Sequence, residues 1–140
     1  MNVSIPKDEK TNLSDSDDVY RIMQKILLRQ NKLRRKREYF WTIGLSTAND
    51  IEYIELVAIG KLNTVNIDPV ETFSFAVSKK CKKLILCHNH PSEVLKPSLN
   101  DKDTTSRMVD AGHILGIEIV EHLIINENQF FSFSNNDLLR

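Results

Sequence analysis

Two histidines, a serine and an aspartate lie close enough together in the chain to share one site. They are His88, His90, Ser98 and Asp101. Successive side chains of a strand point to opposite faces, so an extended segment through Asn89 places both imidazoles on the same side. Two imidazoles on one face can chelate a divalent metal. A His-x-His pair alone is a common pattern, so a metal site requires a further ligand.

The helical period around Asp101 supplies that ligand. Ser98 can cap a helix with Asp101 three residues on, so one interpretation is a capping arrangement with both groups solvated. The 3.6-residue period also places Asp101 on the face that must pack against the sheet, and an inward carboxylate needs a cation. That face is shared with Thr105, Met108, Gly112 and Leu115.

Two imidazoles and a carboxylate leave a fourth position for water, as catalytic zinc sites do. Zinc suits this mixed ligand set, so the sequence predicts a Zn²⁺ cofactor. Two further histidines are not expected to be ligands: His113 as an exposed helical residue and His122 as a hydrogen-bonded core residue near the site.

Strands alternate with helices around these residues, which predicts an α/β sheet packed on both sides. The expected strands cover residues 38–46, 51–60, 83–87, 117–125 and 129–134, and the later helices cover 68–81 and 99–115. We expect a flexible tail over residues 1–14, an N-terminal amphipathic helix within residues 15–35 that ends near Leu33, and one domain over residues 36–140.

Composition restricts the classes of partner. The 19 basic residues balance the 19 acidic residues, so net charge favours neither nucleic acid nor a membrane surface. No apolar run approaches the roughly 18 residues that span a bilayer, and no leader is recognised, so we expect a cytoplasmic protein.

Cys81 and Cys87 are expected to be buried, reduced thiols. A basic run, residues 29–37, is either a solvated helix end or a contact for phosphate or an acidic partner.

The spacing of these residues resembles the signature of the JAMM (MPN+) metalloproteases. The string His88-Asn89-His90-Pro91-Ser92, followed by Pro97-Ser98, resembles the RadC branch of that family, and the resemblance extends from about Glu38 to the C-terminus. It implies a three-layer α/β/α fold with a mixed sheet, the cytidine-deaminase-like architecture. The sequence before Glu38 is shorter than in full-length RadC relatives, and we expect their N-terminal helix-hairpin-helix region to be missing.

The resemblance also implies roles. His88, His90 and Asp101 would bind zinc, Ser98 would stabilise the tetrahedral intermediate, and Glu38 would be the general acid and base. Glu38 can reach the site only if its strand runs antiparallel beside residues 83–87. Glu52 and Glu55 are rival carboxylates, and Glu38 has the alternative of a surface ion pair with Arg34 or Arg35. Two departures from the family pattern, Lys61 and Glu93, affect loop shape and substrate fit.

The first hypothesis is therefore a zinc metallopeptidase that hydrolyses a peptide or isopeptide bond in a peptide or protein substrate. The alternative is an accessory module without peptidase turnover, which binds metal or associates with DNA repair through the basic run. No membrane partner is expected.

Overall fold

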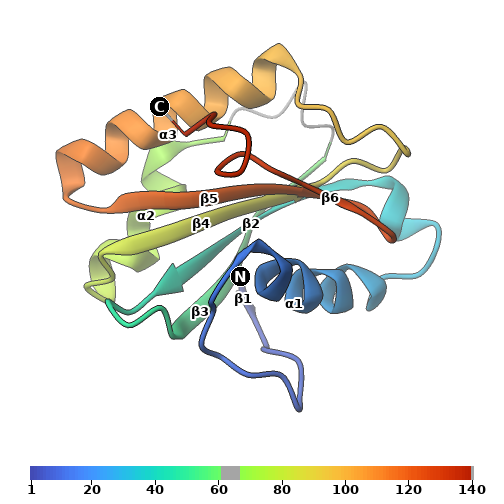
Figure 1. Cartoon of the computed structure of the whole chain (residues 1–140), viewed down its shortest axis with the longest axis horizontal. Coiled ribbons are helices and arrows are strands. Elements are labelled where there is room, and N and C mark those ends of the chain that lie inside the picture. The colour runs from blue at the N-terminus through green and yellow to red at the C-terminus, as the bar shows by residue number, and fades with distance from the viewer. Residues whose placement is uncertain (61–66, 140) are drawn as a thin grey trace.

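Six strands form one mixed sheet within residues 1–60 and 67–139, the part of the chain that the computed structural model describes (Figure 1). Their order across the sheet is β1-β3-β2-β4-β5-β6. Their bounds are β1 (Asn2–Val3), β2 (Glu38–Leu45), β3 (Ile51–Gly60), β4 (Lys83–Asn89), β5 (Glu118–Ile125) and β6 (Phe130–Ser132). β4 and β5 are parallel, whereas the other neighbouring pairs are antiparallel.

Helices cover both faces of this sheet, as Figure 1 shows. α1 (Ser16–Leu28) packs on one face, and α2 (Pro69–Ser78) and α3 (Leu99–Leu115) pack on the other. Each face has its own apolar core, with Ile85 and Cys87 on the α1 side and Leu84 and Leu86 on the other side. This confirms the α/β fold class with a mixed sheet. None of the helices described is long and apolar enough to cross a bilayer.

The first helix is shorter than the sequence predicts, because α1 ends at Leu28 rather than near Leu33. Its apolar stripe stops at Leu27, and Leu33 is 74% exposed, so packing does not extend the helix further. A short 3₁₀ turn (Arg34–Lys36) then leads into β2.

The segment over residues 1–14, for which the sequence predicts a flexible tail, contacts the sheet in the structure. Asn2 and Val3 pair with β3, and the N-terminal amine donates to the Leu56 carbonyl at 3.0 Å. Leu13 is buried in the core beneath α1. The segment therefore covers one edge of the sheet, and its flexibility stays a prediction.

Strand register brings the candidate residues to one end of the sheet. Phe40 of β2 lies opposite His88 of β4 in an antiparallel pair, so β2 begins where β4 ends. α3 begins on the same side, after the loop that follows β4. Ligand sites of α/β sheets usually lie at the carboxyl ends of strands. Both thiols are buried and free, as predicted. Lys61, one of the two departures from the family pattern, lies outside the described residues.

Candidate metal centre

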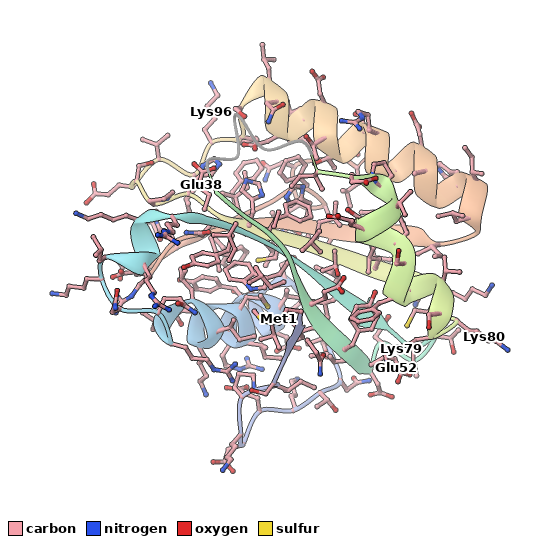
Figure 2. The ribbon with its side chains drawn as sticks, turned by 180° about the vertical axis from the view of Figure 1, so that it is seen from behind. Met1, Glu38, Glu52, Lys79, Lys80 and Lys96 are labelled. Atoms are coloured by element: carbon pink, nitrogen blue, oxygen red, sulfur yellow. The ribbon has the colours of Figure 1, made fainter. Side chains whose placement is uncertain are left out.

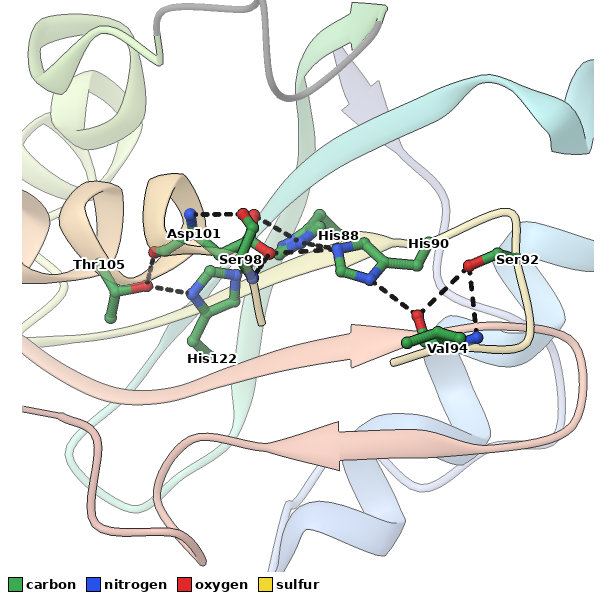
Figure 3. Close-up of polar contacts among 8 residues, drawn as sticks. All are labelled: His88, His90, Ser92, Val94, Ser98, Asp101, Thr105 and His122. Carbon is green, nitrogen blue, oxygen red and sulfur yellow. Dashed lines mark hydrogen bonds and ion pairs between the residues drawn. The ribbon is translucent and has the colours of Figure 1, made fainter. Parts of the chain in front are cut away.

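Two imidazoles and one carboxylate converge at the end of β4 (Figure 3). The Nε2 atoms of His88 and His90 are 3.2 Å apart. His88 Nε2 lies 3.3 Å from Asp101 Oδ1, and His90 Nε2 lies 3.2 Å from Asp101 Oδ2. The three residues predicted from sequence are thus brought together, with one possible ligand atom from each within 4.8 Å of the other two.

These separations fit a zinc ion. Tetrahedral coordination with bonds of about 2.0–2.1 Å places neighbouring ligand atoms about 3.3 Å apart. The two imidazole Nε2 atoms, 3.2 Å apart, match that spacing, and each also lies 3.2–3.3 Å from an Asp101 oxygen, His88 from Oδ1 and His90 from Oδ2. The donor set of two nitrogens and one carboxylate also suits zinc. The residues present therefore fit the cofactor that the sequence predicts.

The strand–loop junction fixes the directions of both histidines. Residues alternate along β4, so Cys87 faces the core beneath α1 while His88 faces the side of α3. The backbone N–H of His90 donates to the Ile125 carbonyl at 2.9 Å, which holds the chain against β5 just beyond the strand. The alternation predicted from sequence is confirmed, and Cys87 is directed away from the site.

Asn89, between the two histidines, joins β4 to the beginning of β2. Its Oδ1 accepts from the backbone N–H of Tyr39 at 2.7 Å, and its Nδ2 donates to the Arg37 carbonyl at 2.9 Å. The Asn89 side chain is buried, and its bond from Tyr39 is shielded from water. The sequence alone assigns no role to Asn89. A polar residue that lies between two inward histidines, and so points to the opposite face of the strand, indicates a buried hydrogen-bonding partner on that face.

Asp101 combines the two roles that the sequence left as alternatives. Ser98 is the N-cap of α3, with its hydroxyl accepting from the Asp101 N–H at 3.0 Å. In return Asp101 Oδ2 accepts from the Ser98 N–H at 2.8 Å. The same carboxylate is buried and faces both imidazoles. The capping box therefore orients a candidate ligand, because it fixes the carboxylate at the first turn.

The charges of the cluster are set by burial and by Asp101. Burial lowers the pKa of His88 and outweighs the opposing influence of Asp101. At His90, burial acts in the same downward direction, but hydrogen bonding and charge from Asp101 leave the pKa raised. Burial would raise the pKa of Asp101, but the two imidazoles beside its carboxylate hold that pKa well below the usual range. The Asp101 carboxylate is therefore ionised at neutral pH.

Behind His88 lies a second buried imidazole. His122 Nε2 is 2.7 Å from His88 Nδ1, and His122 Nδ1 is 2.6 Å from the Thr105 hydroxyl oxygen (Figure 3). Burial lowers the pKa of His122 well below its ordinary value, which keeps the ring neutral. Phe40 stacks on His88 with the ring centroids 6.2 Å apart. The prediction of a hydrogen-bonded core histidine is confirmed. The helical period predicts that Thr105 lies on the face of α3 that packs against the sheet, but it does not predict the contact with His122.

Glu38 lies at the end of the sheet where the candidate metal centre is. It is the first residue of β2, and the antiparallel pairing with β4 confirms the geometry on which that role depended. Glu38 lies two residues from Phe40, the residue opposite His88, and therefore on the same face of the sheet. After burial and Asp101, its charge is a further influence on the pKa of both ligand histidines.

The rival carboxylates lie elsewhere. Figure 2 shows Glu52 at the opposite end of the sheet from Glu38. Glu55 faces the N-terminal amine at 3.8 Å. Arg35, one of the suggested surface partners of Glu38, forms an ion pair with Glu127 at 2.7 Å. Of Glu38, Glu52 and Glu55, Glu38 is the glutamate at the end of the sheet where the candidate metal centre lies.

A cavity of about 230 Å³ opens beside His90. Arg35, from the basic run, lines it together with the loop after β4 and the β5–β6 turn. Its polar lining comprises Arg35, Asn89, His90, Ser92, Glu93, Asn126, Glu127 and Asn128. Glu93, the second departure from the family pattern, therefore borders this cavity together with His90.

The fold and the site define a JAB/MPN-type α/β domain with a candidate metal centre at the end of a strand. The chain belongs to the RadC-like JAB domain family, whose model matches residues 13–138.

Its relatives are known as UPF0758 proteins. The chain is 40% identical over 104 residues to one from Clostridioides difficile strain 630, covering 74% of this chain and 44% of the relative. It is 43% identical over 103 residues to one from Moorella thermoacetica, covering 74% and 45%. A third, from Methanosarcina barkeri, is 34% identical over 134 residues, covering 96% and 56%. The chain thus spans about half the length of the curated relatives it matches.

Proposed function

We propose that this chain is a zinc-dependent hydrolase that cleaves a peptide or isopeptide bond. The observation that carries the proposal is the convergence of His88, His90 and Asp101, each of which offers one ligand atom within 4.8 Å of the other two. A structural zinc site uses four protein ligands, whereas a catalytic site uses three and leaves one position for water or substrate. Three donors from the described residues therefore favour catalysis.

Each residue near the centre has a chemical task under this proposal. When bound, zinc would lower the pKa of water to about 7 and polarise the scissile carbonyl. Glu38 would accept the proton of the attacking water and transfer it to the leaving amine, which needs a carboxylate on the same face as the ligands. The Ser98 hydroxyl would donate a hydrogen bond to the oxygen that gains negative charge. The cavity beside His90 would receive part of the substrate chain.

The first experiment measures zinc content and turnover on the same preparations. The substrates are a pooled library of internally quenched peptides and a pooled library of lysine-branched isopeptides. We expect about one zinc per chain and turnover in the wild type. Asp101→Ala should lose both, whereas Glu38→Gln should keep zinc and lose turnover.

Matched controls separate these effects from general damage. Asp103→Ala changes an exposed aspartate of α3, and Glu52→Gln changes the glutamate at the far end of the sheet. Both controls should keep zinc and turnover. Absence of stoichiometric zinc from the wild type would refute the hydrolase proposal. Zinc without turnover on either library would favour a metal-binding module instead.

The second candidate function is a DNA-associated accessory module. It is supported by the exposed side chains of the basic run, Arg29, Lys32, Arg34, Lys36 and Arg37. A gel shift of duplex DNA that weakens steeply with salt, and disappears when Arg34, Lys36 and Arg37 are changed to Gln, would support this function. No shift at low salt would exclude it.

A further inference from the structure

Thr105, His122 and His88 form a buried row of hydrogen-bonding groups that ends at the candidate metal centre (Figure 3). All three side chains are at most 1% exposed. Their polar atoms are 2.6 and 2.7 Å apart along the row, so each contact requires one hydrogen between the two atoms. The row can be read as a chain of donors and acceptors.

The direction of this chain is set at Thr105. Its hydroxyl donates to the backbone carbonyl of Asp101 at 2.8 Å. A hydroxyl has one hydrogen to donate, so the same oxygen accepts from His122 Nδ1. A neutral imidazole has one N–H, and His122 Nε2 is therefore an acceptor towards His88 Nδ1.

The consequence reaches the metal centre through His88. Because its Nδ1 carries the hydrogen, its Nε2 presents a bare lone pair to Asp101 Oδ1, 3.3 Å away, and to His90 Nε2, 3.2 Å away. A lone pair beside a carboxylate oxygen is favourable when a cation lies between them. If every hydrogen bond in the row ran in the opposite direction, the N–H of His88 would be on Nε2, where it would block a metal. Thr105 would then donate to His122 and would lose its hydrogen bond to the Asp101 carbonyl.

We infer that Thr105 and His122 are positioning residues that hold His88 in the Nδ1–H tautomer and so direct its Nε2 lone pair at the metal position. The inference rests on the proposed metal centre. Hydrogen-bond partners behind a ligating histidine commonly change metal affinity 10–100-fold when they are removed. Here the partner behind His88 is itself fixed by a hydroxyl on α3, the helix that supplies the third ligand.

The first test observes the tautomer without metal. Long-range ¹H–¹⁵N correlation spectra of the zinc-free wild type, labelled at histidine, distinguish Nδ1–H from Nε2–H rings. We expect both His88 and His122 to be Nδ1–H. An Nε2–H tautomer for His88 in the wild type would overturn the inference.

The second test measures zinc affinity by chelator competition. Thr105→Val removes the hydroxyl at nearly constant volume and should weaken zinc binding about 10-fold or more. Thr105→Ser keeps the hydroxyl and should bind zinc about as tightly as the wild type.

Thr72 on α2 provides the matched control. It is also buried and its hydroxyl donates to a carbonyl four residues back, that of Asp68, at 2.9 Å. Thr72→Val therefore loses the same kind of helix bond on a helix that carries none of the candidate ligands, and its zinc affinity should be unchanged. Equal zinc affinities for Thr105→Val and Thr72→Val would overturn the inference.

Failure of this inference can be distinguished from failure of the proposed function. A wild type that binds zinc, with Thr105→Val binding it equally well, refutes the positioning role alone. A wild type that binds no zinc refutes the hydrolase, and the spectra of the zinc-free protein still decide the tautomer. If Thr105→Val does not fold, Thr105→Ser and the wild-type spectra carry the test: loss of affinity in Thr105→Ser would contradict the role of the hydroxyl.

Discussion

Removing the Ser98 hydroxyl should affect stability and catalysis separately, because that hydroxyl has two roles. As the N-cap of α3 it accepts a hydrogen bond of 3.0 Å from the Asp101 N–H. Replacing an N-cap Ser by Ala typically destabilises a protein by about 1 kcal/mol, whereas Gly at the same position costs only a few tenths. In this chain of 140 residues, 1 kcal/mol corresponds to a decrease of about 3–4 °C in Tm.

The catalytic role predicts a different pattern. Because Ser98 Oγ is the acceptor in the capping bond, its own hydrogen is available to a developing oxyanion, and loss of such a donor lowers kcat about 10²–10³-fold. Ser98→Ala and Ser98→Gly should therefore lose turnover equally, although only Ser98→Ala is appreciably less stable. Ser98→Thr should keep both properties.

Thermal unfolding followed by circular dichroism, with kcat on the best peptide of the library, measures both effects. Zinc content should be determined for each variant, since the Ser98 backbone also contacts the Asp101 carboxylate. Wild-type kcat in Ser98→Gly would refute the catalytic role and leave Ser98 as a helix cap.

Three further predictions concern the surroundings of the site. Asn89→Ala should lower the free energy of unfolding by about 1–3 kcal/mol, because the buried N–H of Tyr39 loses its partner. Turnover should fall more than zinc affinity. An unchanged urea unfolding curve would contradict this role of Asn89. The pKa of Asp18 is lowered mainly by the hydrogen bond from the Ser14 N–H. Its stabilising contribution is therefore present above the unfolded pKa of about 3.9 and lost as pH falls below it. Asp18→Asn should flatten the decrease in stability between about pH 5 and pH 3, and an unchanged pH profile would argue against the bond. Gly112→Ala should destabilise the fold by about 1–3 kcal/mol, since an added Cβ would lie 2.2 Å from a backbone carbonyl oxygen; a calorimetric Tm equal to that of the wild type would show that α3 can shift.

The sequence predicted the directions of the three candidate metal ligands because two simple periods determine them. Strand alternation directs His88 and His90 to one face, and the helical period directs Asp101 inward. The same period placed Leu115 on that face, but Leu115 is 46% exposed. Leu115 lies in the last turn of α3, which ends at the Gly116 C-cap, and its side chain borders an open apolar groove shared with α2.

Other features depend on partners distant in sequence and carry no local signal. Nothing around Thr105 indicates that its hydroxyl faces His122, because that contact requires α3 to cross β5 at one particular register. Asn89 reads as a spacer until β2 is known to begin beside it. A strand as short as β1 (Asn2–Val3) is formed by pairing with β3 and cannot be recognised from a two-residue pattern.

X-ray absorption at the zinc edge of the purified protein tests the central claim most directly. Coordination by His88, His90, Asp101 and water predicts a first shell of nitrogen and oxygen at about 2.0–2.1 Å, with the multiple-scattering pattern of two imidazoles and no sulfur. The same spectrum should be obtained from Glu38→Gln. A first shell that contains sulfur at about 2.3 Å, or a protein without bound zinc, would contradict the account.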